Sequence, residues 1–281
     1  MDRLTPHFLS VGLRTLLALQ RRPLRGLHAE ALREAAQLSL APAEAASEVE
    51  IDALRAALKA SAETIQMQDF GAGTQAGLLA ALAKPDERRI AEIYERAAAT
   101  PAWGRFLFCL VRALRPRHVL ELGANLGVSA AHIVAALDHN HREGGEEAHL
   151  VTLEGDPTLA NLAREHLVPT GRATVVTGRF VDTLPEVLAT RSPFDLVFLD
   201  GHHEEAATLQ YFAMIRPHLA PGACVVFDDI EPTRPVRRAW KRVLTEEPSS
   251  GHADLLGLGL WFAPFAEADA KVPRKASAAV Q

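Results

Sequence analysis

The chain has 281 residues and a net charge of −5, and hydrophobic residues make up 48% of it. This composition is typical of a soluble globular protein with a large core. It offers no basic surface for nucleic acid, and no apolar run approaches the roughly 20 residues that a membrane-spanning helix needs. The two cysteines, Cys109 and Cys224, lie inside apolar runs. We interpret both as reduced core thiols of a cytoplasmic protein rather than as a disulfide or as reactive thiols.

The first hundred residues are rich in Ala, Leu, Glu and Arg and predict an all-helical extension over residues 1–99. Between Arg3 and Leu27 there are five arginines and no acidic residue, interleaved with leucines. Such a helix could be a targeting or membrane-surface element, but serine is scarce and no cleavage pattern follows. We therefore favour a basic-faced helix that packs on the body of the protein or on a second subunit. The extension would then serve as a lid or as a dimerisation element.

The stretch IQMQDFGAGTQAG, residues 65–77, interrupts this helical pattern. Its alternation and its glycines predict a short extended piece followed by a flexible turn. Asp69 and Phe70 in this stretch could belong to a mobile lid over a bound substrate or to an ordinary connector. Further helices are expected after Asp86 and after Pro101.

From residue 117 onward, short and almost uniformly apolar β-rich runs alternate with segments whose apolar residues recur at helical spacing. This alternation predicts a mostly parallel sheet covered by helices on both faces, that is, a doubly wound α/β domain over residues 100–266. The segment HADLLGLGLWFAPF, residues 252–265, has no room for a helix. It predicts an antiparallel hairpin at one edge, which gives seven strands in all. Residues 267–281 predict a frayed tail.

Acidic side chains stand at the ends of four of the predicted strands: Glu121, Glu154, Asp200 and the pair Asp228–Asp229. In doubly wound sheets, ligands bind outside the carboxyl ends of the strands. These strand ends are therefore the candidate positions for a ligand site.

The loop ELGANLGVSA, residues 121–130, follows the first of these strands. Gly123 and Gly127 allow a tight turn and the close approach of a ligand. Asn125 stands where the glycine pattern of a dinucleotide site would place a further glycine, and Glu121 would be a poor neighbour for a diphosphate. The loop therefore favours S-adenosyl-L-methionine over NAD, whereas Glu154 could accept hydrogen bonds from the ribose of either cofactor. The alternative is that Glu121 closes the loop and the glycines only turn the chain.

Three carboxylates are expected to meet at one point, because Asp200 and the pair Asp228–Asp229 end neighbouring strands. They would repel one another unless a cation neutralised them. An all-oxygen ligand set suits Mg²⁺, Mn²⁺ or Ca²⁺, so we predict a divalent metal site at these three residues. Alternatively, one or two of them cap the helices that follow.

His203 lies three residues after Asp200, so both side chains can address one pocket. If the bound cofactor donates its methyl group to a hydroxyl, the hydroxyl proton must be removed, and a neutral imidazole can accept it near pH 7. We therefore expect His203 to act as the general base beside Asp200. The neighbouring His202 could line the substrate pocket, hold a helix N-terminus or have no direct role.

Five segments together resemble a known family: VLELGANLGVSA, VTLEGDP, GRFVDTLPEVL, FDLVFLDGHH and ACVVFDDI. In order and spacing they are similar to the class I S-adenosylmethionine-dependent O-methyltransferases. The similarity is to the catechol and caffeoyl-CoA type and to the metal-dependent O-methyltransferases of macrolide sugars. The resemblance spans about residues 100–264 and implies a Rossmann-like, seven-stranded, mostly parallel sheet.

The resemblance also implies roles for individual residues. Gly123 and Ser129 would hold the methionine end of the cofactor, with Gly104 near its carboxylate, and Glu154 would bind the ribose. The adenine would be bordered by residues of the GRFVD segment, namely Phe180, Val181 and Asp182. Related enzymes hold a divalent metal with acids at the positions of Asp200, Asp228 and Asp229. The macrolide-sugar enzymes share the D-x-x-H spacing and the acid pair.

Two departures from the catechol enzymes bear on the acceptor: Asp229 replaces an asparagine, and no aromatic gate follows Asp200. Both favour a vicinal diol on a sugar or natural product over a catechol. Nearby, the segment TRPVRRAW could reach an anionic substrate, although a solvated helix face with one core tryptophan is the favoured reading; its residues are Arg234, Arg237, Arg238 and Trp240.

Three rival functions remain open from the sequence: a metal-independent methyltransferase acting on another nucleophile, an NAD-dependent oxidoreductase, and a non-catalytic cofactor-binding protein. The favoured hypothesis is methyl transfer to a hydroxyl of a small-molecule acceptor, in a protein that could form a homodimer.

Overall fold

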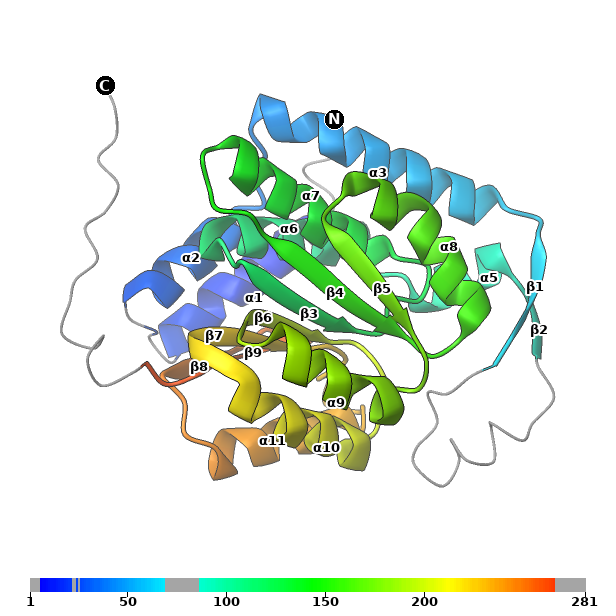
Figure 1. Cartoon of the computed structure of the whole chain (residues 1–281). Helices are drawn as coiled ribbons and strands as arrows, with labels where there is room; N and C mark the ends of the chain where they lie inside the picture. The colour runs from blue at the N-terminus through cyan, green and yellow to red at the C-terminus, as the bar shows by residue number, and fades with distance from the viewer. Residues whose placement is uncertain (1–5, 22–23, 25, 69–85, 266–281) are drawn as a thin grey trace.

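The computed structural model describes residues 6–21, 24, 26–68 and 86–265, and Figure 1 shows them in colour. A seven-stranded sheet has the strand order β5-β4-β3-β6-β7-β9-β8. Its neighbouring strands from β5 to β7 pair in parallel, whereas β9 runs antiparallel to both β7 and β8. The strands are β3 (His118–Leu122), β4 (His149–Glu154), β5 (Ala173–Thr177), β6 (Phe194–Leu199), β7 (Leu219–Phe227), β8 (Gly251–Asp254) and β9 (Gly259–Phe262). The predicted doubly wound fold and its edge hairpin are confirmed.

Helices cover both faces of the sheet (Figure 1). One face carries α6 (Pro101–Leu114), α7 (Val128–Arg142) and α8 (Pro157–Leu167), and the other carries α9 (Phe180–Arg191), α10 (Glu205–Ile215) and α11 (Val236–Glu246). Because both faces are covered, the central strands are apolar almost throughout. Short 3-10 turns follow α8 and α10, at Val168–Thr170 and Arg216–His218.

The N-terminal part adds α1 (Pro6–Arg21), α2 (Gly26–Ala36), α3 (Pro42–Ala60) and α5 (Ile90–Ala97). Helices α1 and α2 pack against α6 and share its core, as expected of a helix that packs on the body of the protein. The prediction of an all-helical extension is wrong in one place. Strands β1 (Thr64–Met67) and β2 (Asp86–Arg89) form an antiparallel pair, so the helix expected after Asp86 begins only at Ile90. Pairing with β1 overrides the helical preference of the charged β2 sequence.

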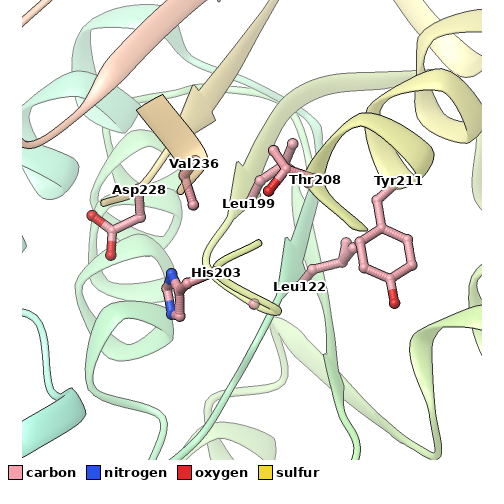
Figure 2. Close-up of a pocket in the computed structure, with 8 residues that line it drawn as sticks. Leu122, Leu199, His203, Thr208, Tyr211, Asp228 and Val236 are labelled. Carbon is pink, nitrogen blue, oxygen red and sulfur yellow. The ribbon is translucent and has the colours of Figure 1, made fainter. Parts of the chain in front are cut away.

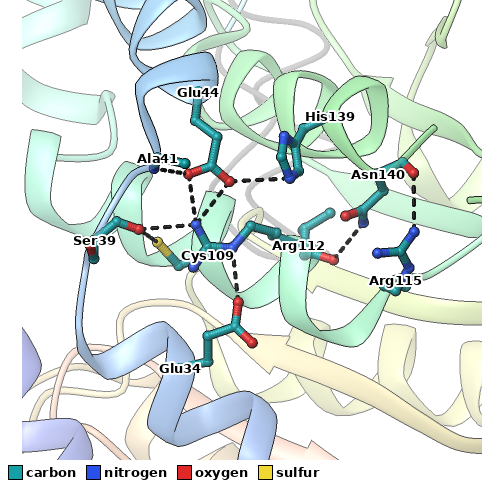
Figure 3. A network of polar contacts seen from close by, with 10 residues as sticks. Glu34, Ser39, Ala41, Glu44, Cys109, Arg112, Arg115, His139 and Asn140 are labelled. Carbon is teal, nitrogen blue, oxygen red and sulfur yellow. Dashed lines mark hydrogen bonds and ion pairs between the residues drawn. The ribbon is translucent and has the colours of Figure 1, made fainter. Parts of the chain in front are cut away.

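A buried ionic network links the N-terminal helices α2 and α3 to α6 and α7, which cover the sheet (Figure 3). Glu44, at the start of α3, is only 2% exposed. Both of its carboxylate oxygens lie 2.9 Å from Arg112 on α6, and one lies 3.3 Å from the ring of His139 on α7. Arg112 also bonds Glu34 on α2. One carboxylate therefore links three helices.

Both cysteines are free and buried, which confirms them as core thiols. Burial raises the pKa of Cys109 to about 12 and raises that of Cys224 further, so neither is a reactive thiolate. Among the described residues, no helix is both long and apolar enough to cross a membrane. Asp69, Phe70 and the predicted C-terminal tail lie outside the described residues.

Candidate active site

A cavity of about 660 Å³ lies at the carboxyl ends of the parallel strands. Gly123 after β3, Glu154 at the end of β4, Asp200 after β6 and Asp228 after β7 all line it. Trp103, near the start of α6, contributes to the wall. Ligand sites in proteins typically measure about 300–1,000 Å³. The strand ends therefore enclose enough room for a small-molecule ligand, as the topology predicted.

The glycine loop after β3 depends on backbone conformations that glycine adopts without strain. Gly123 has φ 103° and packs so closely on the carbonyl group of Asp200 that a Cβ atom there would collide with it. Gly127 has φ 76° and caps the N-terminus of α7. Asn125, between them, is also left-handed at φ 47°. The loop thus packs directly against the residue that follows β6, and so lies next to Asp200.

Glu121 lies beneath this loop rather than in the cavity wall. Its carboxylate is fully buried and accepts hydrogen bonds of 2.6 Å from the hydroxyl groups of Ser129 and Thr152. Burial raises the pKa of Glu121 to about 7. In this structure Glu121 and Ser129 therefore bond each other, as a loop-closing acid would, and a direct contact of either with a ligand stays a prediction.

The end of β4 presents acceptors to the cavity. The Glu154 carboxylate accepts the backbone N–H groups of Asn125 at 2.7 Å and of Asp156 at 2.9 Å. Burial raises its pKa above the ordinary value. The side-chain oxygen of Asn125 is buried and has no hydrogen-bond partner. Because buried polar atoms are almost always paired, this orphaned oxygen is consistent with a missing ligand that donates a hydrogen bond.

Other predicted cofactor residues divide into two groups. Phe180 lines the cavity where α9 begins. Val181 and Asp182 are not part of the lining, and the carboxylate of Asp182 bonds Arg179 at 2.7 Å. Gly104 also lies away from the lining, inside α6, where a Cβ atom would collide with His132.

Two carboxyl groups meet at the ends of β6 and β7. The side chains of Asp200 and Asp228 lie within hydrogen-bonding reach of each other. Burial, together with the charge of the partner, raises the pKa of Asp200 well above its usual range, and burial raises that of Asp228 to about 6. The two carboxyl groups therefore resist simultaneous ionisation when no cation is bound.

His203 lies beside this acid pair. Its Nδ1 atom is 3.3 Å from a carboxylate oxygen of Asp229, and its Nε2 atom is 3.7 Å from one of Asp200. The imidazole is 43% exposed and lines the cavity, so a ligand can reach it. The side chains of Asp200 and Asp229 thus both lie near His203, and Asp228 lies next to Asp200.

Figure 2 shows a second, much smaller hollow between His203 and the helices α10 and α11. Its volume is about 10 Å³, close to what one water molecule needs. Asp228, Thr208 and Tyr211 contribute polar groups to its lining, and Val236 and Leu199 contribute apolar ones. This hollow is too small for a substrate, so the chemistry must use the larger cavity.

Comparison with known proteins shows which enzymes this chain is similar to. A family model described as a methyltransferase domain matches residues 120–230. Catechol O-methyltransferase of Mycobacterium tuberculosis is 34% identical over 162 residues, which cover 56% of this chain and 66% of that protein. The crystal structure of cofactor-bound Rv0187 from MTB superposes with a TM-score of 0.50 at 27% identity and covers 61% of this chain and 84% of that one.

The chain contains a methyltransferase domain and is similar to O-methyltransferases, among them a catechol O-methyltransferase. An O-methyltransferase from Bacillus cereus, solved in complex with SAH, has the same fold at 22% identity and a TM-score of 0.50. That match covers 60% of this chain and 83% of the other. The chain spans 66% or less of the length of the curated relatives that it matches. The similarity to macrolide-sugar enzymes stays a prediction.

The predicted acid cluster does not have the geometry of an assembled metal centre in this structure. Within the described ranges, no three His, Cys, Asp or Glu side chains are arranged so that they could hold one metal ion. The donor chemistry nevertheless fits a hard cation, because Asp200, Asp228 and Asp229 offer only oxygen atoms. A cation bound there would offset the repulsion between the Asp200 and Asp228 carboxylates.

His202 and the basic segment after β7 also have defined positions. His202 has φ 50° and lines the cavity, and its Nδ1 atom is 2.9 Å from the hydroxyl of Tyr211. Arg234 lines the cavity with its Nε atom 4.0 Å from Asp229. The remaining residues of the segment bond elsewhere or are buried: Arg237 to Asp254, Arg238 to Glu205, and Trp240 in the core. The favoured reading therefore applies to the exposed Arg238 and to the core tryptophan, whereas Arg237 is largely buried in its pair with Asp254.

Several site residues lack a sequence signal of their own. Tyr211 lies within an ordinary amphipathic helix pattern, and Met67 and Gln68 reach the cavity only because β1 folds against it. The backbone N–H of Gln68 donates to Asp156 at 2.7 Å, which ties β1 to the turn after Glu154. The alternation of residues 65–67 indicated an extended piece but gave no information on where it would dock.

Proposed function

We propose that the protein transfers the methyl group of S-adenosyl-L-methionine to a hydroxyl of a small molecule. The acceptor we favour is a vicinal diol on a sugar, a natural product or a related compound. The observation that carries this proposal is one continuous cavity, lined by Glu154 and Asn125 at one part and by Asp200, His203 and Asp229 at another. The first group suits a ribose, and the second suits an acceptor hydroxyl that must lose its proton.

In the proposed reaction, the acceptor oxygen attacks the sulfonium methyl group in line with the carbon–sulfur bond. As the new carbon–oxygen bond forms, the electron pair of the breaking bond stays on sulfur and yields S-adenosylhomocysteine. His203 takes the hydroxyl proton, and Asp229, 3.3 Å from its Nδ1 atom, orients the ring and stabilises the imidazolium. Glu154 would fix the donor by its ribose hydroxyls, so that the methyl group faces His203.

A divalent cation, Mg²⁺ or else Mn²⁺ or Ca²⁺, is part of the proposal. Asp200, Asp228 and Asp229 would hold it, and when bound it lowers the pKa of the acceptor hydroxyl. The support is electrostatic, because two buried carboxyl groups in contact are costly to ionise without a cation. A metal-independent transfer to another nucleophile is the second candidate, and the absence of an assembled three-ligand geometry among the described residues favours it.

Turnover with and without a chelator tests both candidates. The purified protein is incubated with S-adenosyl-L-methionine and a panel of sugar and aromatic vicinal diols, and S-adenosylhomocysteine is quantified. We expect product with Mg²⁺, its loss with EDTA, and its recovery when excess Mg²⁺ is added. Turnover that EDTA leaves unchanged would select the metal-independent candidate. Calorimetry that detects NAD but no S-adenosylhomocysteine would contradict both.

The remaining alternative is a protein that binds the cofactor without catalysing transfer. It predicts that S-adenosylhomocysteine binds, that no acceptor is methylated, and that His203→Ala leaves the cellular phenotype unchanged. A cytoplasmic location, homodimer formation and a lid or dimerisation role for residues 1–99 are further parts of the proposal. The exposed leucines of α1, at positions 9, 13, 16 and 17, support the dimer.

A further inference from the structure

A buried guanidinium group without a counter-ion lies between the N-terminal helices and the site. Arg55, on α3, is 5% exposed. Within the described ranges of the chain, no carboxylate lies within 4 Å of its nitrogen atoms. Its Nη1 atom donates to the carbonyl oxygen of Ala99 at 2.8 Å and lies 3.4 Å from the Tyr94 hydroxyl, and its Nη2 atom is 3.1 Å from Nε2 of His132. Its Nε atom is buried without a partner. Burial of an unpaired charge is costly, so an anion bound nearby would stabilise the Arg55 guanidinium.

The neighbours of Arg55 do not supply negative charge. His132, on α7, is 1% exposed, and burial together with the charge of Arg55 lowers its pKa to about 3, so it is neutral. The next cation, Arg105, is already paired with Glu48. Helix α6 begins at Pro101, next to Ala99, and the N-terminus of a helix carries a partial positive charge. The region therefore has a positive potential that no described side chain balances.

Arg55 lies directly behind one wall of the cavity. Ala99, whose carbonyl oxygen Arg55 holds, lines the cavity together with Thr100, the N-cap residue of α6. Arg55 itself is absent from the lining. An anionic group bound against Ala99 and Thr100 would thus feel the guanidinium charge across a single layer of backbone, where screening by water is weak.

We propose that Arg55 attracts and positions the α-carboxylate of the methyl donor at the Ala99–Thr100 wall. That carboxylate is the one anionic group of S-adenosyl-L-methionine, and the inference rests on the proposed function in requiring that donor. Arg55 is a positioning residue, because it acts through the wall and touches neither donor nor acceptor. Helix α3 of the N-terminal segment then completes the donor site, which residues 100–266 alone would leave without this charge.

Two ligands that differ by a single group test the inference. Calorimetry on the full-length protein compares S-adenosylhomocysteine with its decarboxylated analogue, which keeps the adenosine, the sulfur and the amine. We expect the wild type to prefer S-adenosylhomocysteine by about tenfold or more. Arg55→Met and Arg55→Gln should bring the ratio of the two affinities close to one, whereas Arg55→Lys, which keeps the charge, should retain most of it. The glutamine variant can still donate a hydrogen bond to Ala99, which guards against loss of the fold.

The matched control is Arg172→Met. Arg172 is also buried, at 8% exposure, but its partners are Asp138 and Glu147, away from the cavity. Its loss should lower the melting temperature without changing the affinity ratio. An unchanged ratio in the Arg55 variants, or a wild type that binds both ligands equally, would overturn the inference and leave the proposed function intact. A wild type that binds neither ligand would overturn the proposed function and the inference with it.

Discussion

At the scale of single residues, the proposed chemistry depends most on His203. Its ring contacts the carboxylates of Asp229 and Asp200 and is open to the cavity. His203→Ala should lower kcat by roughly 10²–10⁴-fold, because the acceptor proton loses its base. The affinity for S-adenosylhomocysteine, measured by calorimetry, should change less than about threefold. His141→Ala, an exposed histidine on α7, is the control and should leave kcat unchanged. A His203→Ala enzyme with wild-type kcat would remove the base from the mechanism.

Glu121 gives a prediction about stability and pH. Its pKa is about 7 in the folded protein and about 4.3 in an unfolded chain. The folded state therefore binds this proton more tightly, and the free energy of unfolding should fall as the pH rises from about 4 to about 7. Urea unfolding of the ligand-free protein at pH 5 and pH 8 measures this loss. In Glu121→Gln we expect the loss to be smaller by roughly 1–3 kcal/mol. An identical pH dependence in the variant and the wild type would contradict the buried, protonated carboxyl group.

Residues of the candidate site can be predicted from the sequence when they follow a strand. Glu154, Asp200, Asp228 and Asp229 each stand at the end of an apolar run, and topology alone brings strand ends together. Arg55 has no comparable signal, because its isolation from carboxylates depends on how α3 packs on α6 and α7. The sequence also did not reveal that Gly104 lies away from the cavity wall. Neighbouring positions of a helix face different directions, and the sequence alone does not fix which of them faces the cavity.

At the scale of elements, the buried network around Glu44 should hold α3 and α2 onto the sheet's helices. Glu44→Ala leaves the Arg112 guanidinium buried with fewer partners, so we expect a loss of about 3–5 kcal/mol in the free energy of unfolding. The measurement is urea unfolding followed by circular dichroism. Glu246→Ala, which removes the exposed pair with Arg242, is the control and should be indistinguishable from the wild type. Equal effects of the two substitutions would show that the network contributes little.

Some helices and strands could be predicted from patterns in the sequence, and others could not. The apolar strands and amphipathic helices after residue 117 are specified locally, so their order and the edge hairpin could be predicted. The strand Asp86–Arg89 could not, because its charged residues favour a helix and only the partner strand β1 makes the extended form stable. Pairing between strands that are far apart in the sequence leaves no pattern of apolar residues in either strand from which it could be predicted.

At the scale of the whole molecule, the apolar side of α1 predicts self-association. Leu9 and Leu13 are 57% and 58% exposed and lie one helical turn apart, and Leu16 continues the stripe. We expect a homodimer in analytical ultracentrifugation of the full-length protein, and a monomer for Leu13→Lys, which places a charge in the stripe. Val49→Lys, at a 67% exposed position on α3, is the control and should stay dimeric. A wild type that sediments as a monomer at all concentrations would refute the dimer.

The central claim is that one cavity at the strand ends holds the methyl donor and faces it toward His203 and the acid cluster. A crystal structure of the protein grown with S-adenosylhomocysteine and Mg²⁺ tests this claim most directly. The account predicts the ribose hydroxyls on Glu154, the sulfur atom directed at His203, and a metal ion bound by Asp200, Asp228 and Asp229. A ligand bound outside this cavity, or one whose sulfur points away from His203, would contradict it.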